Sequence, residues 1–273
     1  MSKSKKKSNQ SLTLLIVFLL ALILIMFGII VGMMMNRGEQ KQIDSESVTE
    51  VSESETTEEI NEVGLAYETA EDAEIDFQVL QSENPDVFAW LYIPGTEIDY
   101  PVLQSEESDK FYESHDQYQN ESDGGAIYTE LANMKSMCDF NTVLNGKGGE
   151  DGLFSDLYRY ADPEFFESHG PVYLYLDDNL LTYEVFAAFE RDNTSLIRTY
   201  DFTYISGCQT FLDDLYESRE MGKIIREGWE DVTPYHFLIT LTTTSPANPD
   251  KQYVVIAALV GDAAGKIDRV VVE

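Results

Sequence analysis

The sequence has few of the side chains on which metal centres and disulfide-bonded folds depend. Its 273 residues include two cysteines and three histidines. Two cysteines are too few for a disulfide framework, although one bridge between Cys138 and Cys208 remains open. The sequence also contains no zinc-ligand spacing, phosphate-binding loop or Ser-His-Asp order. We therefore predict that the protein uses no metal and no cofactor.

Basic residues are scarce as well. Lys and Arg number 18 against 50 Asp and Glu, which gives a formal net charge of −32. A nucleic-acid partner is excluded, because phosphate binding requires a basic protein face. The acidic pairs Glu150-Asp151 and Asp213-Asp214 offer oxygen ligands for weak calcium binding, but we interpret them as solvated surface.

Charge is absent altogether from residues 12–35, and four lysines but no acidic residue precede them. An uncharged run of 24 residues can span a bilayer core of about 30 Å as a helix. The run is longer than the apolar region of a signal peptide, and no small-residue cleavage motif follows it. We predict a cytoplasmic basic tail at residues 1–11 and an uncleaved single-pass anchor in the cell membrane at residues 12–35. The remaining chain would be extracellular.

Aromatic residues are nearly absent from residues 36–74. Gly38 to Glu74 holds thirteen acidic residues against one lysine, together with many Ser, Thr and Val. Such a segment cannot bury enough apolar surface to offset the entropy of ordering it. We predict a disordered, self-repelling tether here, with an acidic binding tail as the alternative.

Residues 75–273 have the pattern of one mixed, mainly β domain. The strands that we predict by β-branched and aromatic content cover residues 86–93, 98–103, 124–128, 141–144, 171–177, 181–189, 237–243 and 252–260. The helices that we predict cover residues 75–84, 151–160, 205–215 and a segment that opens with Asp162 as a cap and Pro163 as its first residue.

The last two predicted strands are the centre of the pattern. A polar loop with two prolines separates them at residues 245–250. Residues 253–260 have no polar face, which predicts a strand that is buried on both sides. An active site is expected where the first of these strands ends, at Thr244, and where the second begins, at Gln252.

The order of motifs in this domain resembles that of the class B sortases of Gram-positive bacteria. The pieces that carry the resemblance are Asn84-Pro85-Asp86, Ile93-Pro94-Gly95-Thr96, Ile98-Asp99-Tyr100-Pro101-Val102, Asn141-Thr142-Val143-Leu144, Tyr183-Glu184-Val185-Phe186, residues 238–243 and Tyr253-Val254-Val255. The resemblance implies a closed eight-stranded sortase-type β-barrel with N-terminal helices and a long helix before the penultimate strand. The predicted membrane anchor and tether also suit that family.

Sortases are cysteine transpeptidases, and the resemblance implies three reacting positions in this chain. The family's histidine position is held by Lys147, its cysteine position by Thr244 and its arginine position by Gln252. A hydroxyl needs a positioned base to act as a nucleophile, and a charged lysine is not one. Gln252 is a weaker donor to an oxyanion than a guanidinium, and Lys251 should point to the opposite face of the strand. We therefore predict no catalytic residue here.

Other residues do not restore the chemistry in the sequence. Cys138 precedes one predicted strand and Cys208 lies on a predicted helix, so neither matches the nucleophile. His115, His169 and His236 match non-catalytic positions and are expected to be ordinary polar or capping residues. The residues that we expect to line a peptide groove are Thr243, Thr244, Ser245 and Gln252.

Three functions remain open. The favoured one is a non-catalytic pseudo-sortase that binds a sorting-signal segment, a pilin-type protein or another sortase at the outer membrane face. The alternative is an active transpeptidase or hydrolase that uses Thr244 or Ser245 with Lys147. A structural role of the acidic surface in the cell envelope is the third.

Overall fold

The computed structural model describes residues 69–70, 73–218, 222–245 and 248–269, which belong to a compact unit that begins at Ile60. The predicted tail and anchor, and the tether up to residue 68, lie outside the described residues. Among the described residues, no helix is both long enough and apolar enough to cross a membrane.

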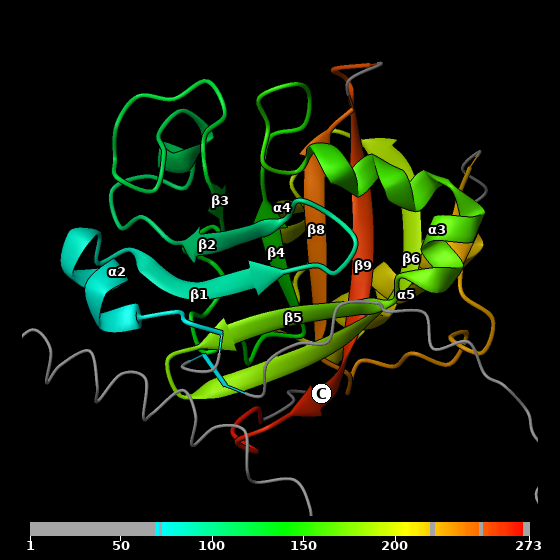
Figure 1. The fold of residues 1–273 in the computed structure, drawn as a ribbon. Coiled ribbons are helices and arrows are strands. Elements are labelled where there is room, and N and C mark those ends of the chain that lie inside the picture. The colour runs from blue at the N-terminus through cyan, green and yellow to red at the C-terminus, as the bar shows by residue number, and fades with distance from the viewer. Residues whose placement is uncertain (1–68, 71–72, 219–221, 246–247, 270–273) are drawn as a thin grey trace, which may run out of the picture. The chain divides into compact units, whose positions relative to one another are not determined.

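The described elements are mostly strands, with short helices between them (Figure 1). The strands are β1 (Val87–Tyr92), β2 (Asp99–Leu103), β3 (Ile127–Tyr128), β4 (Asn141–Asn145), β5 (Pro171–Leu176), β6 (Asn179–Asp192), β7 (Ile224–Ile225), β8 (Leu238–Thr244) and β9 (Lys251–Asp262). The helices are α2 (Phe77–Glu83), α3 (Pro163–Ser168), α4 (Leu196–Thr199) and α5 (Ile205–Glu217), with 3-10 turns η1 (Phe111–Glu113) and η2 (Ser155–Ala161).

Eight of the strands close into a barrel. Their order is β5-β1-β2-β3-β4-β8-β9-β6, and a further pairing of β5 with β6 closes the ring. The short β7 adds to the free part of β6 outside this ring, at Ala187 and Ala188. The closed eight-stranded barrel expected from the sequence is therefore confirmed, and closure leaves no exposed edge along most of the described sheet.

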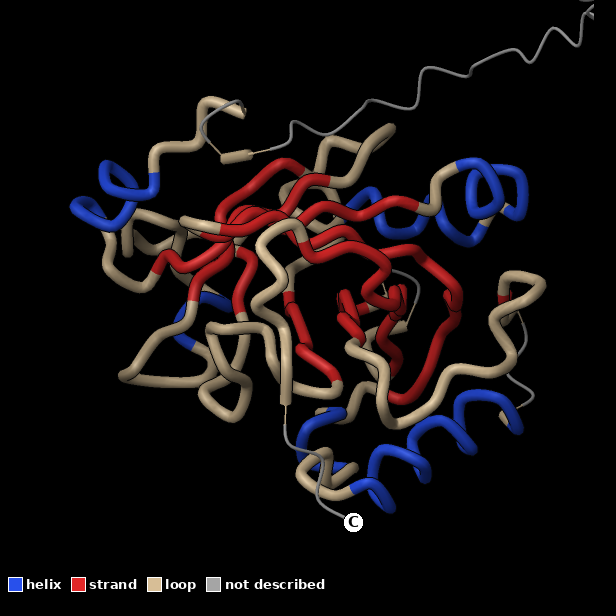
Figure 2. Tube along the Cα trace, turned by 90° about the horizontal axis from the view of Figure 1, so that it is seen from below, coloured by secondary structure: helices blue, strands red, loops and turns tan. Residues whose placement is uncertain are grey.

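Alternating side chains divide the long strands between two apolar clusters. Ile239, Leu241 and Val255 lie in the barrel interior, together with aromatic residues from η2 and α3. Leu238, Val254 and Ile256 lie on the opposite, outer face, where Phe211 and Leu212 of α5 cover them. Figure 2 shows the helices outside the strands. The outer face of β8 and β9 is thus buried as well, as two-sided apolar strands require.

Three expectations need correction. The strand expected to be buried on both sides over residues 253–260 is buried only as far as Ala258. Val260 is 56% exposed, because β8 pairs with β9 no further than Ala258. The strand expected at residues 124–128 shrinks to Ile127–Tyr128, since Gly125 has a φ of 64° and belongs to a turn. The helix expected at residues 151–160 is a 3-10 helix over Ser155–Ala161, which ends where Asp162 turns extended to cap α3.

A hydrogen-bond hub around Asn84 joins α2 and β1 to the loop after β2. The Asn84 amide donates to the Tyr112 hydroxyl at 2.8 Å and to the Gln117 carbonyl at 2.9 Å. The Tyr112 hydroxyl in turn donates to Asp86 at 2.7 Å. Burial, together with the charge of Asp86, raises the pKa of Tyr112 to about 12.

This hub predicts a loss of stability at alkaline pH. The raised pKa of Tyr112 stabilises the fold fully below its unfolded value of about 10, and this contribution is lost as the pH rises through about 12. Urea unfolding between pH 9 and 12 should therefore show a falling free energy of unfolding. The slope should be shallower in Tyr112→Phe, which has no group to ionise.

Tyr118→Phe is the matched control, because that ring is 57% exposed and its loss should leave the slope as in the unaltered chain. Equal slopes for Tyr112→Phe and the unaltered chain would contradict this role of the hub.

Candidate peptide-binding cleft

The three family positions meet at one end of the barrel. Thr244 ends β8 and is paired directly with Gln252 at the start of β9. Lys147 follows β4, which runs parallel to β8, and the Gly146 amide donates to the Thr242 carbonyl at 3.1 Å. A side chain on Gly148 would collide with Thr243, since an added Cβ would stand 2.9 Å from its hydroxyl. The loop after β4 therefore packs closely on the end of β8.

The four expected groove residues do not share one environment. Thr244 is exposed, whereas Thr243, Ser245 and Gln252 are at most 7% exposed. Thr243 pairs with Tyr253, whose ring belongs to the barrel interior. Thr244 and Gln252 are on the other, outer face, because neighbouring residues of a strand alternate.

Gln252 is held in place on both sides of its amide. Its oxygen accepts a hydrogen bond from Thr242 at 2.9 Å, and its nitrogen donates to the Thr194 carbonyl at 3.0 Å. The side chain thereby connects β8 and β9 to the segment that follows β6. Both polar ends of this buried amide are satisfied within the chain.

Arg191 is a cleft residue that sequence reasoning missed. It pairs with Gln252 across β6 and β9, so the two side chains lie on the same face. Its guanidinium donates to the carbonyl and the hydroxyl of Thr194 at 2.7 and 3.2 Å. Burial lowers the pKa of Arg191 somewhat, against the opposing effect of Tyr200 and Asp192. A guanidinium thus stands one strand away from the position that a sortase would give to arginine.

The two lysines near the cleft have partners elsewhere. The Lys147 ammonium donates to the Asp123 carbonyl at 2.8 Å, on the loop before β3. The Lys251 ammonium lies 2.8 Å from the Asp192 carboxylate. Lys251 and Asp192 form the cross-strand pair next to Gln252 and Arg191. The lysine that holds the family's histidine position is therefore directed at a backbone oxygen of another loop.

Ser245 belongs to a small polar group at the barrel mouth. Its hydroxyl donates to the Glu190 carboxylate at 2.7 Å. The Tyr158 ring stacks on the Tyr253 ring, with centroids 4.8 Å apart, and the Tyr158 hydroxyl donates to the Thr244 carbonyl at 3.3 Å. Burial raises the pKa of Tyr158, and its contact with Ser245 partly offsets this rise. The alternative mechanism requires Ser245 to pair with Lys147, but the Ser245 hydroxyl pairs with Glu190 instead.

A cavity of about 580 Å³ opens between two walls beside Phe140, the residue that precedes β4. One wall is formed by residues 132–140, and the other by residues 197–203, with Arg269 beside them. The second wall continues from Thr194, which is bound to Gln252 and Arg191 as described above. None of the family positions lines this cavity. Residues 194–196 link it to Gln252, and we call the cavity together with this linking segment the groove.

Side-chain contacts beside the cavity join the segment after β6 to Glu130 and Asp109. The Ser195 hydroxyl lies 3.4 Å from Glu130, and the Arg198 guanidinium lies 3.9 Å from Glu130 and 3.6 Å from Asp109. We call these contacts the wall bridge. Burial raises the pKa of Glu130 and the charge of Asp109 adds to this, while Arg198 and Ser195 oppose it. Arg198 is largely exposed, so its ion pairs in the wall bridge contribute little free energy.

Both cysteines and all three histidines are described, and their contacts lie away from the three family positions. His115 and His169 stack on Phe111 and Phe165, at centroid distances of 4.0 and 3.9 Å. His236 accepts a hydrogen bond from the Thr233 amide in a turn, at 3.0 Å.

The cysteines are equally separate from the cleft. Cys208 lies on the buried face of α5, and burial raises the pKa of its thiol. Cys138 lines the far end of the groove. The five residues of β4 lie between it and Lys147 and span on the order of 16 Å. Both cysteines are free.

Metal-binding groups are equally scarce. Among the described residues, no three His, Cys, Asp or Glu side chains come together in a group that could hold a metal ion.

Comparison with known proteins gives relatives of one kind. No family model matches the chain. The sortase B of Listeria monocytogenes is 32% identical over 150 residues, which cover 54% of this chain and 47% of that protein. The chain thus matches about half of the length of this curated relative.

Two solved structures extend the likeness to the fold. A mutant form of Clostridium perfringens sortase B has a TM-score of 0.61 at 25% identity, and the match covers 70% of this chain and 88% of that one. A Staphylococcus aureus sortase B-substrate complex has a TM-score of 0.58 at 27% identity, with coverage of 67% and 84% respectively. With the closed barrel and the ordered motifs, these likenesses confirm that the chain is a homologue of the class B sortases.

Proposed function

We propose that this chain is a membrane-anchored, extracellular pseudo-sortase, which binds an extended peptide and does not cleave it. The observation that carries the proposal is the register of β8 and β9. It brings the family positions together at the end of a groove, but with a hydroxyl at Thr244 and an amide at Gln252. The third position, Lys147, supplies an ammonium bound to a backbone carbonyl.

The contacts of the cleft also oppose a substitute mechanism. A threonine or serine hydroxyl needs a base within hydrogen-bond reach. The Lys147 ammonium already donates to Asp123, and a protonated amine has no lone pair to accept a proton. Arg191 has the charge for an oxyanion, but its guanidinium is bound to Thr194. The alternative, a hydrolase with Thr244 or Ser245 and Lys147, therefore has little support from geometry.

The groove retains features that suit a peptide backbone. Asn141 and Asn145 lie on the same side of β4 as Val143, which faces outward. Neither amide nitrogen has an acceptor among the described residues, but Asn141 is fully buried, so the half-buried Asn145 is the donor that a peptide can reach. Buried donors without partners are uncommon in native proteins, and a bound peptide would supply carbonyl acceptors. The Staphylococcus relative is described with a substrate bound. We propose a secreted or pilin-type protein with a sorting signal, or a partner sortase, as the ligand.

The first test compares binding with chemistry. The full-length chain in non-ionic detergent should bind members of a panel of synthetic sorting-signal peptides reversibly, as measured by fluorescence anisotropy. Intact mass should remain unchanged after long incubation, since no activated nucleophile is present. Intact mass should remain unchanged in Thr244→Ala and Ser245→Ala as well. A covalent adduct or cleaved peptide that either substitution abolishes would establish the hydrolase instead.

The second test concerns the wall bridge. Arg198→Ala should raise peptide affinity by up to about five-fold, because an exposed ion pair that keeps the groove closed contributes at most about 1 kcal/mol. The measurement is the same anisotropy titration, at low and high salt. The gain should be smaller at high salt, where the ion pair is already screened.

Lys266→Ala is the control for this variant, since it removes an exposed ion pair with Asp178 away from the groove. A lower affinity for Arg198→Ala than for this control would mean that Arg198 contacts the peptide and does not close the groove.

A further inference from the structure

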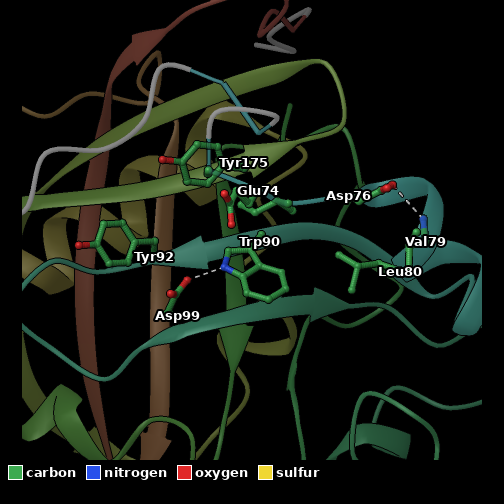
Figure 3. A pocket seen from close by; sticks show the side chains of 10 residues that line it. Glu74, Asp76, Val79, Leu80, Trp90, Tyr92, Asp99 and Tyr175 are labelled. Carbon is green, nitrogen blue, oxygen red and sulfur yellow. Dashed lines mark hydrogen bonds between the residues drawn. The ribbon is translucent and has the colours of Figure 1, made fainter. Parts of the chain in front are cut away.

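A second pocket lies on the opposite wall of the barrel from the cleft. It has a volume of about 530 Å³ and lies between α2 and the outer faces of β1, β2 and β5 (Figure 3). In the ring of strands, β1 and β8 are four positions apart, so the pocket is separate from the groove. Its volume is within the usual range of small-molecule sites, about 300–1,000 Å³.

Aromatic rings form the floor of this pocket. Trp90 of β1 pairs with Tyr175 of β5, and Tyr92 pairs with Tyr173, so these rings lie on one face. The rings of Tyr92 and Tyr173 are stacked, with centroids 6.1 Å apart. Trp90 and Tyr92 are two residues apart and face outward, since Leu91 between them is buried in the barrel core.

The charged groups of the pocket are all acidic. Glu74, Asp76 and Asp99 line it, and no lysine or arginine among the described residues does. Asp99 accepts a hydrogen bond from the Trp90 indole at 2.6 Å, which fixes the carboxylate at the edge of the ring. Figure 3 shows Glu74 between Tyr175 and Trp90. Asp76 caps α2 through the Val79 amide at 3.0 Å, so its role is partly structural.

We propose that this pocket binds an alkylammonium group, either on a lysine side chain of another protein or on a free aliphatic amine. Carboxylates beside the half-buried rings of Trp90 and Tyr92 attract a cation by charge and by the ring quadrupole. Ile75, Val79 and Leu80 in the lining provide apolar surface for the alkyl chain. The carboxylates exclude an anionic ligand.

The test uses pentylamine and 1-pentanol, which have the same alkyl chain and differ in charge. Isothermal titration of the full-length protein in detergent should show that pentylamine binds at least about ten-fold more tightly than 1-pentanol at low salt. Glu74→Gln and Asp99→Asn should each weaken pentylamine binding by about three- to ten-fold, and Trp90→Leu should weaken it further. Glu164→Gln, an exposed acid on α3, is the matched control and should change nothing.

Equal binding of the amine and the alcohol, or unchanged binding in both acid variants, would overturn the proposal. A second arm compares pentylamine with Nα-acetyl-lysine methylamide, which identifies a lysine side chain as the source if it binds more tightly and a free amine if it binds less tightly. The groove is on another wall, so Glu74→Gln should leave peptide binding there unaltered. Failure of one proposal is thus distinguishable from failure of the other.

Discussion

The antiparallel pairing of β8 with β9 is the constraint on which the cleft depends. It places Thr244 opposite Gln252, and the pairing of β9 with β6 places Arg191 opposite Gln252 in turn. The three side chains thus form one row across three strands on the outer face of the barrel. A slip by one residue would turn Thr243 and Tyr253 outward and bury the row. The two apolar clusters, one inside the barrel and one under α5, prevent such a slip because each strand is buried on both faces.

Within this frame, the polar groups of the cleft bind the chain itself. Gln252 and Arg191 both donate hydrogen bonds to Thr194. Lys147 donates to a backbone carbonyl, and Ser245 donates to Glu190. A reacting group must instead direct its lone pair or proton at a substrate. The same hydrogen bonds keep the segment after β6 in position as a groove wall. The residues at the family positions therefore also fasten this part of the chain, and both effects support the proposed binding role.

The sequence predicted most of the barrel because its strands carry strong local signals. β-branched runs end at prolines, glycines and acidic turns, as β5 does before Asp177-Asp178, so the elements were found without any knowledge of their partners. The motif order also located Lys147, Thr244 and Gln252 at one site.

Arg191 was missed because its importance comes from pairing with a residue about 60 positions later, and no local pattern reports such a register. The wall bridge was missed for the same reason, since Arg198 and Glu130 lie on separate loops. The exposure of Val260 depends on where β8 begins, because Leu238 pairs with Ala258, and the apolar run did not reveal this boundary.

The central claim is that the groove survives and that only the reacting groups are absent. The most direct measurement is peptide cleavage and acyl-enzyme formation by the variant Lys147→His, Thr244→Cys, Gln252→Arg, followed by intact mass. The variant should be made with and without Arg191→Gln, because two guanidinium groups would otherwise face each other across β6 and β9. The account predicts a thioester adduct and transfer of the peptide to an amine. A folded variant that binds the panel peptides but forms no adduct in either background would contradict it.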